Sequence, residues 1–148
     1  MRIRQITPMS EIDAYLDEEL ERIDRVLIRC AAESGERGNK QSRMHHTYTD
    51  RTGNLTSSMS YCVTKNGNLV LGGHCEEVKK GHTGVKEGEI FAKQLIAEFP
   101  DNIAVIQSAG MDYAGDVSAK GNDVLDSGEL VAERTLKDRL TKAGFKVR

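Results

Sequence analysis

The feature of the sequence that most constrains the fold is a change of hydrophobic period within residues 48–71. Leu55, Ser58 and Met59 are spaced three and four residues apart, so they share one side of a short helical turn. From Met59 onward the period becomes two, which is the period of a strand whose alternate side chains point to opposite faces. The segment therefore predicts a loop and one helical turn, followed directly by a strand.

The predicted strand leads into a β-hairpin. Its side chains form two sets, with Met59, Tyr61 and Val63 on one face and Ser60, Cys62 and Thr64 on the other. Asn66 and Gly67 then supply the positive φ angles that a two-residue type I′ turn requires. We expect a second strand to follow this turn and to end near Leu71.

The size and charge of the chain limit the classes of partner. Its 148 residues are enough for a single α+β domain with its own core. The 21 basic and 23 acidic residues give a formal net charge of −2, which offers no electrostatic argument for nucleic acid or an anionic membrane as a partner. No stretch approaches the roughly 18 apolar residues of a membrane span, and the first residues lack the apolar run of a signal peptide. Three cysteines without regular spacing favour a reducing, cytoplasmic setting.

The longest predicted helix covers residues 10–31. Ser10 is placed to cap it, and Asp13 stands at the return position of a capping box. A regular apolar stripe at helical spacing supports the helix, and it consists of Ile12, Leu16, Leu20, Ile23, Leu27 and Cys30. Such a helix could pack on a sheet of its own subunit or on a neighbouring chain.

Two polar segments interrupt the regular pattern. Residues 34–50 and residues 72–84 contain glycines, histidines and charged side chains with almost no apolar periodicity. Long connections of this kind are typically either functional or disordered. We expect both to be mobile loops.

The remaining pattern predicts two helices and a strand. A helix over residues 85–99 stops at Pro100, and a short β run follows at residues 103–109. A final helix over residues 127–143 is followed by Gly144 in the C′ position. Together these elements predict an α+β fold, in which a small antiparallel sheet is packed by the long N-terminal helix and the C-terminal helix.

One candidate for chemistry is a Cys/His set. Cys62, His74, Cys75 and His82 lie within 21 positions, and zinc favours such ligands. However, His74 and Cys75 are adjacent, and the spacings typical of zinc sites are missing. The plainer interpretation is a small strand residue and three loop residues, so no metal or cofactor is assigned.

The other candidates for catalysis are weaker. Ser57, Ser58 and Ser60 occur without a nucleophile elbow, and no orienting group is evident for His74 and Cys75. The adjacent pair His45 and His46, and the paired carboxylates Glu18-Glu19 and Glu76-Glu77, are typical of solvated loops and helix faces. The sequence therefore predicts no catalytic residues.

Three segments carry a resemblance to a known family. Residues 50–59 contain the pattern Thr-Gly-x-Leu-x-x-Ser followed by an apolar residue, residues 106–114 form a strand, small residues and Tyr-Ala, and residues 117–125 lead to the last helix. In this order the three segments resemble the tail-completion, or head–tail joining, family of long-tailed bacteriophages. The first segment also has a local structural interpretation, with Thr52 capping one helical turn and Leu55 anchoring it.

The resemblance implies a function in assembly. It implies a phage or prophage structural protein, a neck or minor tail component, that forms a homo-oligomeric ring with other neck and tail proteins. It further implies assembly in the bacterial host cytoplasm and a final location in the virion. It transfers no catalytic residue.

Two other classes of protein stay open on the sequence alone. One is a small metal-dependent or thiol enzyme that uses Cys62, His74, Cys75 and His82. The other is a host-encoded interaction module without a phage role. Neighbouring portal, capsid and tail genes would favour the phage protein, and a metal assay would detect the enzyme.

Overall fold

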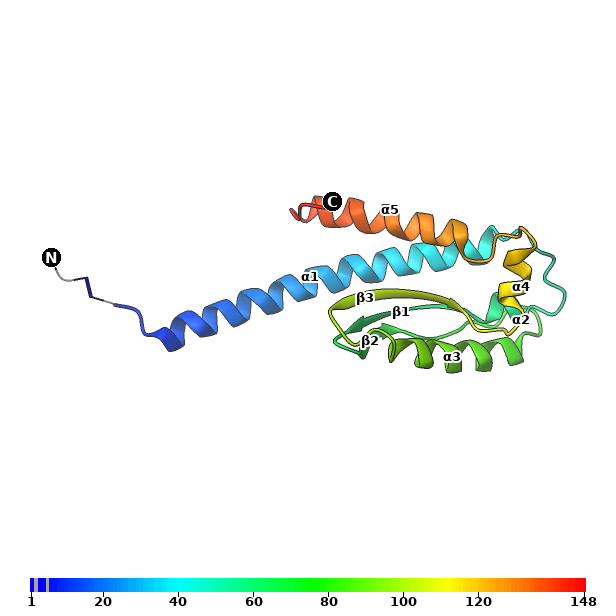
Figure 1. Ribbon diagram of the computed structural model, residues 1–148, viewed down its shortest axis with the longest axis horizontal. Coiled ribbons are helices and arrows are strands. Elements are labelled where there is room, and N and C mark those ends of the chain that lie inside the picture. The colour runs from blue at the N-terminus through cyan, green and yellow to red at the C-terminus, as the bar shows by residue number, and fades with distance from the viewer. Residues whose placement is uncertain (2, 5) are drawn as a thin grey trace.

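The computed structural model describes residues 1, 3–4 and 6–148. Within these residues the chain forms a three-stranded antiparallel sheet and five helices, which confirms the predicted α+β class (Figure 1). In chain order the elements are α1 (Met9–Met44), α2 (Asn54–Ser57), β1 (Met59–Lys65), β2 (Asn68–Gly72), α3 (His82–Ile96), β3 (Ile103–Ala109), α4 (Ala114–Ala119) and α5 (Asp126–Lys142).

The β-hairpin forms as predicted. Asn66 and Gly67 have φ angles of 49° and 75°, the positive values of a type I′ turn, and Lys65 pairs with Asn68 across it. β1 also pairs along its whole length with β3, from Met59 opposite Ala109 onward. The strand order is therefore β2-β1-β3, with β1 in the centre and two edge strands.

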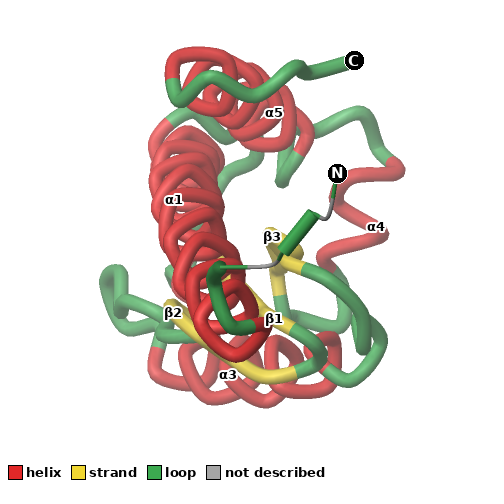
Figure 2. The backbone as a smooth tube through the Cα atoms, turned by 90° about the vertical axis from the view of Figure 1, so that its left-hand side faces the viewer, coloured by secondary structure: helices red, strands yellow, loops and turns green. Residues whose placement is uncertain are grey.

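Helices cover both faces of the central strand. α1 lies across one face of β1 and β3, and α3 lies across the other (Figures 1 and 2). On the first face, a Cβ added to Gly35 would come within 2.4 Å of the Tyr61 ring. On the other, the Ser60 hydroxyl is 3.2 Å from that of Ser108. The predicted alternation of Tyr61 and Ser60 is thus correct. Both faces of β1 are covered by a helix, so its residues 59–64 are buried apart from the half-buried Tyr61.

The N-terminal helix differs from its prediction at both ends. α1 begins at Met9 with Pro8 at the N-cap and no side-chain cap, so the predicted capping box of Ser10 and Asp13 is not formed. At its other end the helix continues to Met44. The prediction of a mobile loop is therefore wrong for residues 34–44.

Small side chains explain this helical extension. Ser34, Gly38 and Ser42 are buried and stand four residues apart, so they form one face of α1. This face meets α5, where the Ser34 hydroxyl donates to the Ala132 carbonyl at 2.8 Å. A Cβ on Gly38 would lie 2.7 Å from the carbonyl oxygen of Gly128, so the two helices approach closely only because both positions lack a side chain. The residues that suggested a loop are those that let two helices touch.

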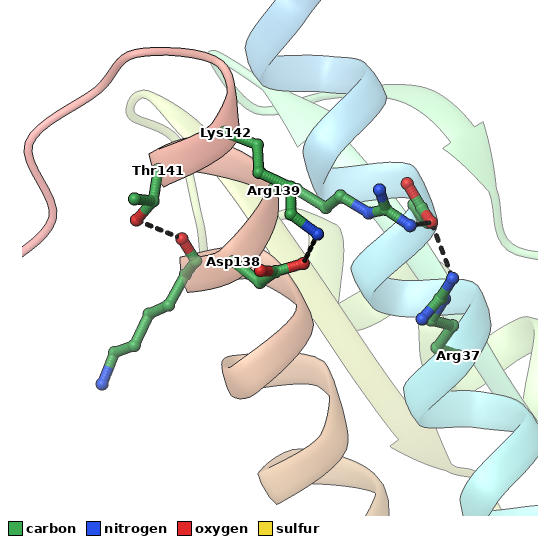
Figure 3. Close-up of polar contacts among 7 residues, drawn as sticks. Arg37, Asp138, Arg139, Thr141 and Lys142 are labelled. Carbon is green, nitrogen blue, oxygen red and sulfur yellow. Dashed lines mark hydrogen bonds and ion pairs between the residues drawn. The ribbon is translucent and has the colours of Figure 1, made fainter.

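Ion pairs flank the contact between these helices. Glu33 on α1 accepts a hydrogen bond from Arg139 on α5 and pairs at 3.0 Å with Arg37 one turn along its own helix. Figure 3 shows Arg139 extending from α5 toward α1, where Arg37 lies. Charged side chains therefore line the helix pair where small residues bring the backbones together.

A compact apolar cluster lies at the end of the sheet near α2 and α4. It consists of Leu55, Met59, Ala109, Ala114 and Val124, with Tyr48, Met111, Val117 and Leu125 packed against it. Leu55 and Met59 enter it from one side of the helical turn, as their spacing predicts. The segments that carry the family resemblance thus meet in one place in the fold.

The second polar segment is irregular but well connected. Gly72 ends β2, and α3 begins at His82 rather than at residue 85, so the loop covers residues 73–81. The Ser57 hydroxyl accepts a hydrogen bond from the Val78 amide at 2.7 Å, and an Arg43 N–H donates to the Glu76 carbonyl at 3.2 Å. The loop prediction is confirmed for residues 73–81, and its mobility stays a prediction.

The C-terminal helix is close to its prediction, because α5 covers Asp126–Lys142 and Gly144 follows with φ 94°. The Phe145 amide donates to the Leu140 carbonyl at 3.0 Å, which closes the last turn. α3 is shifted toward the N-terminus, since it ends at Ile96, and its last residues tighten into a turn before Pro100.

Candidate assembly surface

The most prominent surface feature is the N-terminal part of α1. The Asp24 carboxylate meets the Lys65 ammonium at 2.5 Å at the hairpin end of β1. Residues 9–22 project beyond this point, past the sheet and past the end of α5 (Figure 1). At 1.5 Å per residue this segment, here called the arm, is about 21 Å long.

The arm carries an exposed apolar stripe. The exposed fractions are 58% for Met9, 37% for Ile12, 63% for Tyr15, 52% for Leu16 and 60% for Leu20. Their spacing places most of them along one side of the helix. A contiguous run of large apolar side chains in water is typical of a surface that binds another protein. The sequence predicted the stripe but left open whether its partner is internal, and the structure leaves this half of the stripe without an internal partner among the described residues.

The arm is also strongly acidic. Six carboxylates, those of Glu11, Asp13, Asp17, Glu18, Glu19 and Glu21, stand against the single basic residue Arg22, for a net charge of −5 within residues 9–22. Arg22 itself pairs with Glu19 at 3.1 Å. The arm therefore combines an apolar stripe with acidic flanks, which suits a basic, apolar receptor better than a second acidic arm.

A groove with a mixed apolar and polar lining lies between β3 and α5, and we call it the β3–α5 groove. Its lining residues come from α1, β3 and α5, whose backbones are drawn in Figure 2. Its main hollow has a volume of about 550 Å³. The Asp24–Lys65 ion pair and two asparagines line one part of it, and the rest of the lining is apolar, from Leu27, Ala31, Ile103, Val105, Leu136 and Leu140. A second hollow of about 410 Å³ shares Val105 and Leu136 and extends to Leu125, just before α5. The groove therefore follows most of the length of α5.

The outer strand of the hairpin is a further exposed apolar surface. Leu69, Val70 and Leu71 of β2 are 48%, 43% and 42% exposed. β2 is an edge strand, so its outer backbone groups pair with no other strand of the described chain. Edge strands of this kind can accept a strand from another chain.

The residues of the Thr-Gly-x-Leu segment have structural roles here. The Asp50 carboxylate accepts a hydrogen bond from the Gly53 amide at 2.9 Å, and the Thr52 hydroxyl accepts one from the Asn54 amide at 3.3 Å. Gly53, not Thr52, is the N-cap residue of α2, and its φ of 81° favours glycine. Leu55 is 3% exposed and anchors the turn in the apolar cluster, as predicted.

Tyr48, in the segment after α1, contacts the helical turn α2. The Tyr48 hydroxyl lies 2.8 Å from the Thr56 hydroxyl, and the Tyr48 ring stacks on His46 with centroids 4.1 Å apart. Burial raises the pKa of Tyr48 to about 12, although the hydrogen bond with Thr56 opposes the shift. His46 is thus a packing partner of Tyr48, whereas the sequence suggested a solvated pair.

The Cys/His candidates lie on three different elements. Cys62 is buried in β1, His74 and Cys75 lie in the loop after β2, and His82 begins α3, where its Nδ1 is 2.8 Å from the Glu77 carboxylate. Among residues 1, 3–4 and 6–148 no three His, Cys, Asp or Glu side chains are grouped to hold a metal ion. Burial raises the pKa of the Cys75 thiol, which disfavours the thiolate that a nucleophile needs.

The comparisons with known proteins add no relative. No protein-family model matches the sequence, no curated protein matches it, and no solved structure matches the fold. In the described part of the chain, no helix is both long and apolar enough to span a membrane. The function must therefore be argued from the surfaces themselves and from the resemblance of the three segments.

Sequence reasoning missed the β3–α5 groove altogether. Its residues come from three elements that are far apart in the chain, and only their packing brings them together. The alternation of Ile103 and Val105 and the helical spacing of Leu136 and Leu140 were signals for a core. Nothing local showed that these side chains would be left half-buried at a surface.

Proposed function

We propose that this protein is a structural component of the neck or tail of a long-tailed bacteriophage or prophage, and that it acts in head–tail joining or tail completion by assembling into a ring. Its work is assembly rather than chemistry. The single observation that carries the assembly function is the arm, whose apolar stripe is exposed in the isolated subunit. A protein–protein contact is the ordinary use of such a surface.

The resemblance supports the narrower assignment to a phage. Its three segments, residues 50–59, 106–114 and 117–125, contribute all five buried residues of the apolar cluster. A shared pattern at these positions would therefore reflect a shared core. The resemblance implies the order of helix, helical turn, hairpin, strand and final helix, and α3 with the link before it is additional to that order.

A ring requires two different patches on each subunit. One patch binds the other on the next copy, and the series closes when the rotation returns to the first subunit. The arm is one patch at the N-terminal end of α1, and the groove and the β2 edge are exposed surfaces elsewhere on the body. The chain therefore offers the asymmetry that a closed ring needs.

The test of the phage assignment is the particle. We expect mass spectrometry of purified virions to detect the protein, and electron microscopy of the particle to show it as a closed ring between head and tail. The genes beside its own should encode portal, capsid and tail proteins. Expression of the gene together with absence of the protein from purified particles would refute the neck assignment.

The test of the assembly function is the free protein. We expect a monomer or weak oligomer at low concentration and larger species at high concentration in analytical ultracentrifugation. Replacing Leu16 and Leu20 of the arm with serine should abolish the larger species. The matched control is Ile90→Ser, which removes an exposed side chain of α3 outside the arm. Equal self-association of all three proteins would show that the arm has no part in assembly.

A further inference from the structure

We propose that the N-terminal segment of one subunit, residues 1–6, adds as a strand to the free edge of β2 in a second copy of this chain. The inference rests on the proposed self-assembly and names the surface that receives the end of the arm. It makes the contact a strand addition, in which main-chain hydrogen bonds supply the affinity and alternate side chains the specificity.

The edge of β2 carries little protection against such pairing. β2 pairs with β1 on one side, and in the described part of the chain no backbone hydrogen bond leaves residues 68–72 on the other. Sheet edges are commonly blunted by charged side chains or proline, but residues 66–75 contain no Asp, Glu, Lys, Arg or Pro. A one-residue shift of the register at Val70 is the one such device present. The other edge strand, β3, is less accessible, because its residues are buried or half-buried.

The N-terminal segment has the character of a strand donor. Ile3 and Ile6 are 96% and 93% exposed, and residues 1, 3–4 and 6 lie in no helix or strand. Isoleucine favours strands, and Pro8 disfavours the helical conformation in the residue before it. The sequence therefore favours an extended segment over a longer α1, with apolar side chains that another molecule can cover.

The dimensions of segment and edge agree. Six residues in a strand span about 20 Å, and the five residues of β2 span about 17 Å. A hollow of about 620 Å³ lies beside β2, and its lining includes Tyr61, Leu69 and Leu71. Side chains of an added strand would enter this hollow and cover apolar surface that β2 exposes in the free subunit.

Charge also agrees with this pairing. Residues 1–6 hold two arginines and no carboxylate. Among the described residues, Glu76 is the one Asp, Glu, Lys or Arg that lines the hollow, and its side chain is 85% exposed although Arg43 lies 3.5 Å away. A basic segment would therefore meet an uncharged strand with an acidic residue at its rim.

The segment cannot lie along β2 of its own subunit. The arm carries it about 21 Å beyond the hairpin end of the sheet, so the N-terminus lies far from β2 (Figure 1). Eight extended residues reach at most about 29 Å, so a segment that folded back could not also run along the roughly 17 Å of β2. The contact must therefore be made between copies. Because segment and edge are different patches, each subunit gives one strand and receives another, and the series can close as a ring.

Photo-crosslinking of the full-length protein tests where the segment binds. A benzoylphenylalanine in place of Ile3 would be activated at concentrations where ultracentrifugation shows self-association. Mixing isotope-labelled and unlabelled chains identifies the crosslinks that join two copies. We expect such crosslinks to reach peptides that contain β2. Crosslinks confined to β3, α3, α5 or another arm would overturn the inference and leave self-assembly itself intact.

A comparison of proline and serine substitutions tests whether the contact uses the backbone. Ile3→Pro with Arg4→Pro removes two successive amide donors, and one of the two must face β2 because successive amides of a strand point to opposite sides. Ile3→Ser with Arg4→Ser is the matched control, since it removes the same side chains and keeps both donors. Position 3 is almost fully exposed, so neither change disturbs the folded body.

The proline pair should weaken self-association about tenfold more than the serine pair, as expected for one lost main-chain hydrogen bond. In hydrogen exchange, the amides of residues 69–71 should gain protection on self-association of the unmodified protein but not of the proline variant. Equal association of the proline and serine variants would overturn the strand addition. If the unmodified protein did not self-associate at all, the inference would fall together with the proposed assembly, an outcome distinct from assembly that is insensitive to these substitutions.

Discussion

Gly38→Ala tests whether residues 34–44 form a helix packed on α5 rather than the predicted loop. If residues 34–44 formed a loop, an added methyl group would have little effect on stability. In the structure Gly38 is buried against α5, and its added Cβ would lie 2.0 Å from Gln107 Nε2, 2.7 Å from the Gly128 carbonyl oxygen and 2.8 Å from the Ala132 Cβ. The glutamine side chain can move, but the backbone oxygen cannot move without shifting α5.

Two opposing effects determine the size of the change. Alanine is favoured over glycine inside a helix by about 1 kcal/mol. Overpacking at a tight contact costs about 1–3 kcal/mol and occasionally more. Two of the three close atoms belong to the backbone or the first side-chain carbon of α5 and cannot move away, so we expect an overpacking cost in the upper part of this range, about 2–3 kcal/mol. The free energy of unfolding should fall by about 1–2 kcal/mol.

Urea unfolding followed by circular dichroism would measure this change. Gly128→Ala is the reciprocal variant, since its Cβ would lie 2.6 Å from the Gly38 carbonyl oxygen, and it should be destabilised similarly. Gly115→Ala is the control, because Gly115 is in α4 with nothing within 4 Å of the added atom, and it should gain up to about 1 kcal/mol. If Gly38→Ala were as stable as the unmodified protein, the close packing of α1 on α5 would be refuted.

Three other predictions concern the turn, the tyrosine and the arm. Gly67→Val should lower the free energy of unfolding by about 1 kcal/mol or more, because position 67 has a positive φ of 75°, and an unchanged melting temperature would contradict this. The unmodified protein should lose stability at high pH when Tyr48 ionises, and Tyr48→Phe should abolish this loss. The folded-state pKa of about 12 lies above the ordinary 10, so this contribution is complete below pH 10 and is lost as the pH rises through 12. After allowance for screening at a half-buried site it amounts to about 1–2 kcal/mol. Alkaline unfolding curves measure it, with Tyr15→Phe on the exposed arm as control. In hydrogen exchange on the monomer, the amides of residues 34–44 should be protected and those of the arm should exchange quickly, since only the first are packed. Equal exchange rates in both segments would contradict this, because they would mean either that the arm is packed or that residues 34–44 are not.

The elements that the sequence predicted well are those with a local signal. The hairpin follows from the period of two and the Asn66-Gly67 pair, and β3 agrees with its predicted residues 103–109. α5 lies within one residue of its prediction because Gly144 marks its end. In each case the signal lies in the residues that form the element.

The errors arose where distant contacts decide the structure. Ser34, Gly38 and Ser42 lack an apolar pattern, and they are helical because α5 packs against their small side chains. α3 begins at His82, where the Asn54 side-chain oxygen accepts a hydrogen bond from the Gly84 amide at 3.2 Å. Such contacts join residues 30 or more positions apart, and no local period could reveal them. For the same reason the sequence did not predict the groove. It did predict the apolar stripe of the arm, because that stripe lies within one helix.

The exposed arm suits a subunit that must stay separate until its partners are present. Two acidic arms repel each other, which disfavours pairing through the arms alone. A helical arm of this length that packs its stripe on a partner buries on the order of 1,000 Å² on both partners together, below the roughly 1,200–2,000 Å² of a stable pairwise interface. A single contact is therefore weak. In a closed ring, however, the last subunit makes two contacts while losing its freedom of motion only once, so closure is favoured over short open chains. Weak pairwise contacts of this kind should give monomers and closed rings with few intermediates.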